Sequence, residues 1–305
     1  MAISTVRVQI NGTWTNLTYN SSTGAYEAII TAPSTTSFNR TGGYYPVTVE
    51  ATNSVGTVTT VNDSHSTLGA SCKLVVKEKT IPVITINSPT SGARVTNSKQ
   101  PVVFTITDES GGSGIKLGTL VVKQDGTAVA SSTVVSTAIT NGYSVTYTPA
   151  SALSDGSHSV TLSVSDNDGN AATQKSTTYT IDTVAPTLNI TSPAEGMATA
   201  STSVTVTGTT NDATSSPVTL TMALDSGTAQ AVTVASNGSF TITFSNLGHG
   251  SHKVVIVAKD AAGKTTTITR NFTVDTSTPV ISKITITPNP ADAGNTMTIS
   301  VVVSG

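Results

Sequence analysis

The chain has 305 residues, 10% of them charged, and a formal net charge of −2 at pH 7. This length accommodates two or three domains. The charges supply no basic surface for nucleic acid, and no apolar run is long enough to cross a membrane. The single cysteine, Cys72, cannot form a disulfide within the chain, so apolar cores must hold the fold together.

The first segment, residues 1–78, predicts a hairpin followed by further strands. Val6, Val8 and Ile10 alternate with polar residues and lead into Asn11-Gly12, a pair typical of a tight hairpin turn. Alternation over residues 26–30 (Tyr26, Ala28, Ile30) predicts another strand. About ten extra residues between Gly56 and Val76 carry Val58, Val61 and Leu68, which could form added strands.

One strand and its exit turn recur three times without a gap, beginning at Gly43, Gly156 and Gly250. In each copy alternating apolar residues follow, and an Asp or Asn and then a Gly close the run. These two residue types tolerate the left-handed backbone of a turn. Because no stretch shows helical periodicity, the sequence predicts an all-β repeat protein.

Prolines mark the boundaries between the repeats. Pro82, Pro186 and Pro279 each precede a predicted first strand, where an edge position tolerates a missing N–H. They divide the chain into residues 1–78, 79–183, 184–276 and 277–305. A spacing of roughly 100 residues suits an Ig-like antiparallel β-sandwich, so we expect tandem sandwiches in an elongated rod with short linkers.

The repeat is out of phase with the ends of the chain. Residues 1–78 have no counterpart to the first two strands of a unit, whereas residues 277–305 supply two such strands and nothing more. The apolar residues of this last segment are Ile284, Ile286, Met297, Ile299, Val301 and Val303. We expect them to act as donor strands that complete the domain around Val6, Val8 and Ile10 in the next copy, because strand addition of this kind makes a head-to-tail filament.

Three alternatives explain the same ends. The sequence could be a fragment cut within a repeat. The first domain could close by itself, using the extra residues between Gly56 and Val76. The last two strands could pair with a different protein.

No residue set predicts catalysis, a cofactor or a metal, so we expect no enzyme. His158 and His252 occupy the same repeat position, which indicates a structural role, since catalysis would not be duplicated in each repeat. The acidic run Asp166 to Asn170 resembles a calcium loop but lacks the later glutamate, and we interpret it as a plain turn. Cys72 is expected to be a small buried residue.

Aromatic residues gather in the first segment. Among them Trp14, Tyr19 and Tyr44 are candidates for binding a cell-surface glycan or protein, because aromatic side chains stack on sugars and anchor interfaces. Tyr26 and Tyr45 fall at repeat positions that predict core residues.

Three motifs together resemble the bacterial Ig-like repeat families. They are Asp182 to Gly196, Leu153 to Gly169 and the second copy of the latter at Leu247 to Gly263. The resemblance covers residues 79–276 well and the first segment in part. It implies antiparallel sandwiches with a spacer, display or adhesive role.

Repeats of this kind occur in bacterial surface adhesins and in phage tail and fibre proteins. Because the first 30 residues do not resemble a signal peptide, we expect a phage virion component, with extracellular localisation and itself or other virion proteins as partners. A bacterial surface adhesin or filament subunit is the alternative.

Overall fold

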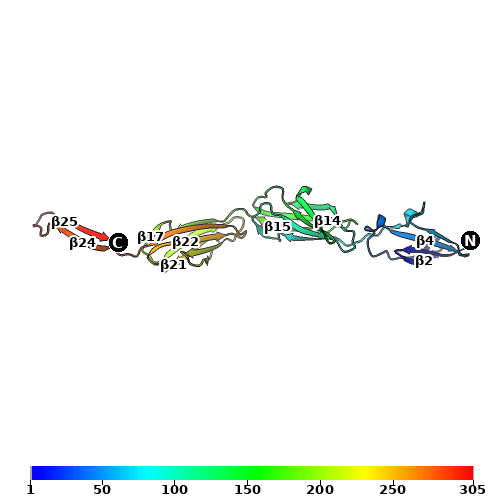
Figure 1. The fold of residues 1–305 in the computed structure, drawn as a ribbon, viewed down its shortest axis with the longest axis horizontal. Helices are drawn as coiled ribbons and strands as arrows, with labels where there is room; N and C mark the ends of the chain where they lie inside the picture. Colours follow the sequence, from blue (N-terminus) through cyan, green and yellow to red (C-terminus); the bar gives the residue numbers. More distant parts are fainter. Residues whose placement is uncertain (1, 305) are drawn as a thin grey trace. The chain divides into compact units, whose positions relative to one another are not determined.

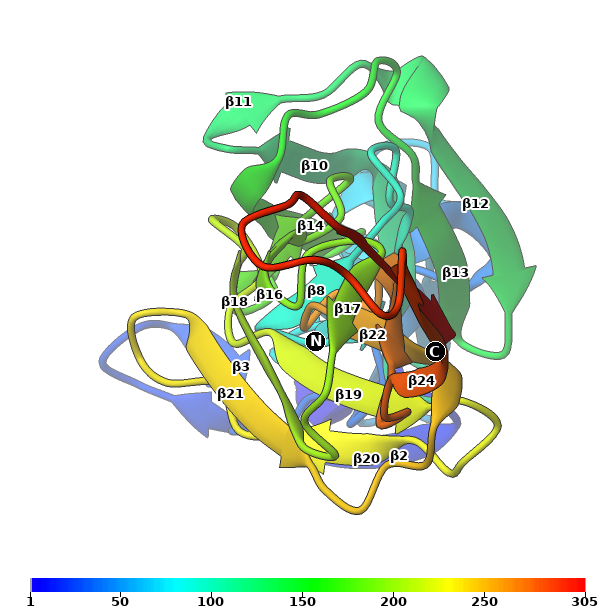
Figure 2. The ribbon, with the colours of Figure 1, turned by 90° about the vertical axis from the view of Figure 1, so that its left-hand side faces the viewer.

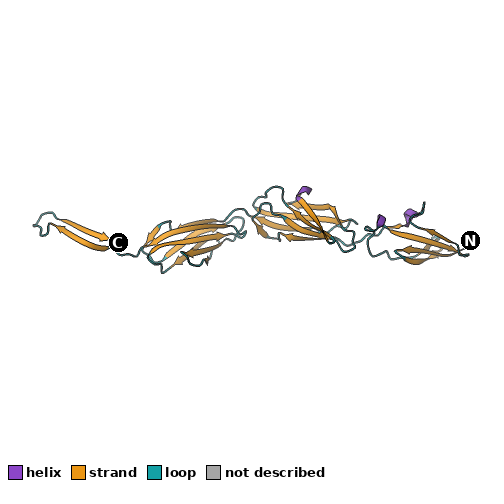
Figure 3. Ribbon diagram, viewed as in Figure 1, coloured by secondary structure: helices purple, strands orange, loops and turns teal. Residues whose placement is uncertain are grey.

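A computed structural model describes residues 2–304, and almost every regular element in it is a β-strand (Figure 3). The chain divides into two compact units, and each is described by itself. The first unit holds residues 1–93 and 99–180. The second holds residues 94–98 and 181–305. The prediction of an all-β chain built from repeated Ig-like sandwiches is confirmed.

The first domain is a single sheet in the order β3-β2-β1-β4-β5, with β6 also pairing β4. Its elements are β1 (Ile3–Ile10), β2 (Thr13–Asn20), β3 (Ala25–Glu27), η1 (Thr41–Gly43), β4 (Tyr45–Asn53), β5 (Val58–Val61), η2 (Gly69–Cys72) and β6 (Lys73–Leu74). The predicted hairpin is present, with Asn11 and Gly12 at φ of 50° and 81°. Cys72 is buried, as expected.

The structure corrects one prediction for this domain and bears on one of the alternatives. The strand expected over residues 26–30 is only β3, and it extends the existing sheet beside β2. Residues 28–30 are exposed and outside any strand, because the neighbour that such a strand has in the other domains is missing here. The extra residues after Gly56 form β5 and β6, but both join β4 in the same sheet. They therefore do not close the domain with a second layer.

The second domain is a complete two-layer sandwich. One layer has the order β12-β13-β9-β7 and the other β11-β10-β14-β15-β8. In Figure 2, β10, β11 and β14 lie on one side of this domain and β12 and β13 on the other. The elements are β7 (Val83–Ser88), β8 (Ala93–Val95), β9 (Val102–Thr107), β10 (Ile115–Gln124), β11 (Thr127–Ala128), η3 (Ser131–Thr133), β12 (Val134–Ile139), β13 (Gly142–Tyr147), β14 (Gly156–Asp166) and β15 (Lys175–Ile181).

The third domain repeats this plan, with layers β16-β18-β21 and β17-β23-β22-β19-β20. Its strands are β16 (Thr187–Ser192), β17 (Met197–Thr199), β18 (Val204–Asn211), β19 (Thr219–Leu224), β20 (Gln230–Val232), β21 (Ser239–Phe244), β22 (Gly250–Lys259) and β23 (Thr265–Val274). Strands β7 and β16, which follow Pro82 and Pro186, lie at sheet edges as predicted.

Register shows that the three domains share one design. Ile10 pairs with Val47, Gln124 with Val160 and Leu224 with Val254, each at the end of a hairpin strand. Alternate residues of the long strand face the core, so Val160, Leu162, Val254, Ile256 and Ala258 are all fully buried. The repeat seen in the sequence is thus a repeat of strand pairing.

The last segment is a lone hairpin of β24 (Val280–Thr287) and β25 (Thr298–Ser304), which pair only with each other (Figure 1). The two predicted strands are therefore present, except that Met297 lies just before β25. Every residue of both strands is exposed.

Candidate functional sites

The hairpin of residues 280–304 has one apolar face. Residues that pair directly across an antiparallel ladder lie on the same side of the sheet. Ile281 pairs with Val303, Ile284 with Val301 and Ile286 with Ile299, whereas Lys283, Thr285 and Thr287 pair with the residues of the opposite side. We call the first set the apolar hairpin face; it consists of Ile281, Ile284, Ile286, Ile299, Val301 and Val303.

These six side chains are between 40% and 61% exposed. A two-stranded hairpin is marginally stable in water and needs a third strand or another layer against its apolar side. The apolar hairpin face therefore lacks the layer that such a hairpin normally packs against, and five of the six donor residues predicted from the sequence lie on it.

The sheet of the first domain also has an apolar side that is only partly covered: Val8 is buried, and its apolar neighbours are half-buried. Val6 pairs with Leu17 and Ala51, Val8 with Val49, and Ile10 with Val47, so these residues share one face of the sheet. We call it the open sheet face; it consists of Val6, Val8, Ile10, Leu17, Val47, Val49 and Ala51. The three acceptor residues predicted from the sequence thus lie together on one surface.

Comparison with the complete domains shows what the open sheet face is missing. Val47, Val49 and Ala51 are only half-buried, whereas the residues at the same repeat positions in the second and third domains are 0–3% exposed. Ile30, Thr31 and Pro33 border a groove of about 230 Å³ together with Val8 and Ile10. Part of the open sheet face is already covered, because Val8 is only 8% exposed. The difference corresponds to the absent layer, which β7 and β9, or β16 and β18, provide elsewhere.

The three candidate aromatic residues do not form one surface. Trp14 pairs with Gln9 on the polar side of the sheet and lies beneath Arg7, whose guanidinium carbon is 4.3 Å from the ring centroid. Tyr19, 55% exposed, follows Leu17 by two residues and therefore lies on the open side, where it contacts Tyr26. Tyr44 lies before β4 and donates a hydrogen bond to the carboxylate of Asp63.

Each of the two repeated histidines forms hydrogen bonds with two other parts of its domain. His158 Nδ1 lies 2.8 Å from a carboxylate oxygen of Asp125, and its Nε2 lies 2.8 Å from the carbonyl oxygen of Ser154. Burial lowers the pKa of His158, but both bonds raise it, and the net shift is upward. His252 repeats the arrangement with Asp225 and the Gly248 carbonyl, which raise its pKa. The structural interpretation of this repeat position fits these contacts.

Two groups of carboxylates lie where loops of a sandwich converge. In the first unit they are Glu78, Asp108 and Glu109, and in the second unit Asp182, Asp212 and Asp260. The sequence favours solvated side chains for Asp108 and Glu109, but Asp108 is only 8% exposed, and the second group was not predicted. Within each group the oxygen atoms lie within 4.8 Å of one another. Two charges at that distance repel by about 3 kcal/mol at an effective dielectric constant of about 20. The signal in the sequence was the acidic residue four positions before Pro82 and Pro186.

Both groups contain buried carboxylate oxygens without a hydrogen bond, and they differ in side-chain length and burial. Burial raises the pKa of Glu78, and the neighbouring Glu109 carboxyl group raises it further. In the second unit the side chains are short aspartates, all at least nine-tenths buried. No hydrogen bond joins one of these three carboxyl groups to another in the described chain.

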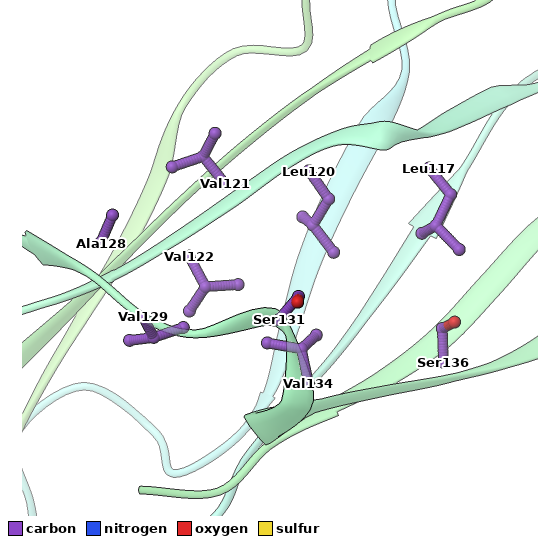
Figure 4. A pocket seen from close by; sticks show the side chains of 9 residues that line it. All are labelled: Leu117, Leu120, Val121, Val122, Ala128, Val129, Ser131, Val134 and Ser136. Carbon is purple, nitrogen blue, oxygen red and sulfur yellow. The ribbon is translucent and has the colours of Figure 1, made fainter. Parts of the chain in front are cut away.

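An apolar groove of the second domain lies beside β10 and β12 (Figure 4). It encloses about 360 Å³ and is bordered by aliphatic side chains, among them Leu117, Leu120, Val121, Val129 and Val134. Ser131 and Ser136 are its only hydrogen-bonding side chains. Because specific ligands need convergent polar groups, the groove identifies no ligand class.

Among residues 2–304, no helix has the length and apolarity of a membrane span.

Comparison with known proteins agrees with this architecture. Residues 80–183 match the model of the bacterial Ig-like domain, and residues 186–276 match that of glucodextranase domain B. No curated protein matches the chain.

Similar solved structures include the fibronectin(III)-like modules of CbhA from Clostridium thermocellum, at 16% identity and a TM-score of 0.38, with 63% of this chain and 94% of that chain covered. A 1.5-MDa bacterial ice-binding adhesin is 21% identical with a TM-score of 0.33, with 91% of this chain and 88% of that chain covered. The two complete sandwiches are Ig-like domains, and residues 80–183 are a bacterial Ig-like domain.

Proposed function

We propose that this protein is a non-enzymatic structural or adhesive protein whose copies join head to tail through their ends. The observation that carries the proposal is a pair of incompletely buried apolar surfaces, the exposed apolar hairpin face and the half-buried open sheet face. The open sheet face lacks a second layer to pack against. The apolar hairpin face belongs to two strands of the kind that form such a layer in the complete domains. Burying them against one another follows the general rule that a β-domain needs two packed layers around one core.

The proposed joint copies the complete domains strand by strand. In the third domain β18 pairs with β16 on one side and β21 on the other. In the joint β25 takes the place of β18 and β24 that of β16. Residues 28–32 of the receiving copy take the place of β21, since Ala28 and Ile30 have the spacing of Ile242 and Phe244. This is strand addition, in which backbone hydrogen bonds and alternate side chains act together.

Such a joint has a polarity, because one copy donates the hairpin and the other receives it. A head-to-tail contact that does not close into a ring produces an open filament. A surface covered mainly by Thr, Ser and Asn, with 10% charged residues, also suits a protein displayed outside the cell. We place this assembly on a phage virion, as a tail or fibre-like component. A bacterial surface adhesin would use the same joint.

Two adjacent substitutions test the joint. Val301→Asp puts a charge on the apolar hairpin face, whereas Val302→Asp puts the same charge on the other side of the same strand. We expect the unchanged chain and Val302→Asp to gain mass with concentration in light scattering, and Val301→Asp to remain a monomer. If all three proteins keep the monomer mass at every concentration, or if both variants assemble equally, the proposed joint is wrong.

Location is tested separately from assembly. Mass spectrometry of purified phage particles from a lysate should detect the chain if it is a virion component. Release of the chain by protease treatment of intact bacteria would instead favour the adhesin.

A further inference from the structure

The second compact unit contains an unexplained group of buried acids, the aspartate cluster, defined as Asp182, Asp212 and Asp260. Their exposed fractions are 0%, 7% and 4%. We propose that the aspartate cluster is a binding site for one divalent cation of the calcium class. This inference does not depend on the head-to-tail joint, which involves other residues.

Separate parts of this unit position the three carboxylates. Asp182 follows β15 and precedes β16, Asp212 follows β18, and Asp260 follows β22. One oxygen of each accepts a backbone N–H bond: Asp182 from Val184, Asp212 from Thr214 and Ser215, and Asp260 from Lys264. The backbone therefore holds the three side chains in place.

Other oxygen atoms at the same place have no partner. The second carboxylate oxygens of Asp182 and Asp260 are buried without a hydrogen bond, and so is the hydroxyl of Ser215. Ser215 lies between the loops, since its N–H bonds to Asp212 and its carbonyl accepts the N–H of Ala261. Unpartnered buried carboxylate oxygens are costly unless a cation binds them or a proton neutralises them.

A protein cation does not neutralise the aspartate cluster. In the described part of the chain, none of the ion pairs found includes Asp182, Asp212 or Asp260. The spacing fits a metal ion instead. Calcium binds oxygen at about 2.4 Å, so two of its ligands lie up to about 4.8 Å apart. The oxygen atoms of the aspartate cluster lie within 4.8 Å of one another.

The donor set selects the class of ion. Carboxylate and hydroxyl oxygens are hard ligands, which suit calcium and magnesium and do not suit metals that prefer sulfur or imidazole. Calcium accepts irregular sets of six to eight oxygens, whereas magnesium demands an octahedron and keeps several waters. A buried site formed by separate loops therefore fits calcium better.

The chain supplies a matched control for the test. Asp182 and Asp275 each lie four residues before a boundary proline, and each accepts an N–H bond from the residue two positions later. Asp275 is exposed and does not belong to a carboxylate group. Asp182→Asn and Asp275→Asn are thus the same chemical change at equivalent positions, and Asn keeps the oxygen that accepts the bond.

Calorimetric titration of calcium chloride into the chelator-treated full chain tests the proposal. We expect the unchanged chain and Asp275→Asn to bind the same number of ions, and Asp182→Asn to bind one fewer. The proposal is overturned if the unchanged chain binds no calcium, or if Asp182→Asn binds as many ions with the same affinity.

Thermal unfolding separates ion binding from a purely structural role. With chelator, Asp182→Asn should unfold at or above the temperature of the unchanged chain, because the change removes a repulsive charge. With millimolar calcium the order should reverse. If Asp182→Asn is less stable by the same amount under both conditions, the aspartate stabilises the fold directly and the assignment is wrong.

Discussion

Residues at equivalent repeat positions have different environments in this chain, and the differences identify the functional surfaces. Val49 on the open sheet face and Leu162 in the second domain occupy the same place in a long central strand. Leu162 is fully buried and Val49 is not. Because the strands are alike, the contrast arises from the missing layer rather than from the sequence around each residue.

Burial predicts how single substitutions affect stability. Ile256→Ala removes a fully buried side chain and should lower the free energy of unfolding by about 2–5 kcal/mol. The Ile284 side chain is 61% exposed, so Ile284→Ala should change the free energy of unfolding by less than about 0.5 kcal/mol in dilute monomer. Chemical denaturation of both variants checks this, and a large loss for Ile284→Ala would show that the hairpin packs within its own chain.

The hydrogen bonds of His158 and His252 predict that the stability of the fold depends on pH. A histidine whose pKa is raised in the folded state stabilises the fold fully below its unfolded pKa of about 6.5 and loses that contribution as the pH rises through the folded value. The melting temperature should therefore fall as the pH rises from about 6 to about 8. The double variant His158→Gln, His252→Gln should show a flatter profile, and an unchanged slope would contradict the assignment.

At the scale of elements, hairpin turns impose the register that all domains share. Gly126 follows Asp125 at a φ of 82° in the turn between β10 and β11, a backbone conformation that favours glycine. Gly126→Ala should destabilise the second domain by about 1–2 kcal/mol. Gly118→Ala is the control, because that position has no left-handed φ and open space around it. Equal losses in denaturation experiments would contradict this role of the turn.

Sequence patterns predicted strands where alternation and turn residues agreed, as in β1, β4, β14, β22 and the hairpin. They failed where pairing decides the outcome. Residues 28–30 have the alternation of a strand but no neighbour to pair with, so they stay outside one. The two apolar surfaces were predictable because apolar spacing does not depend on a partner, whereas their roles as donor and acceptor stay a prediction. The aspartate cluster was not predictable, since residues 182, 212 and 260 converge only in the folded chain.

At the scale of the whole molecule, one account covers both ends of the chain. The hairpin has an apolar face with no second layer against it, and the first domain is one sheet with no second sheet packed on it. Joining the two in different copies gives every domain the same pair of layers. The central feature of the proposed assembly is that each copy completes the fold of the next.

Hydrogen–deuterium exchange of residues 28–32 tests this claim most directly, because these residues are unpaired in the single chain and gain β25 as a neighbour in the joint. The account predicts fast exchange in dilute protein, slower exchange as the concentration rises, and fast exchange at every concentration in Val301→Asp. Equally fast exchange in the concentrated unchanged protein would contradict it.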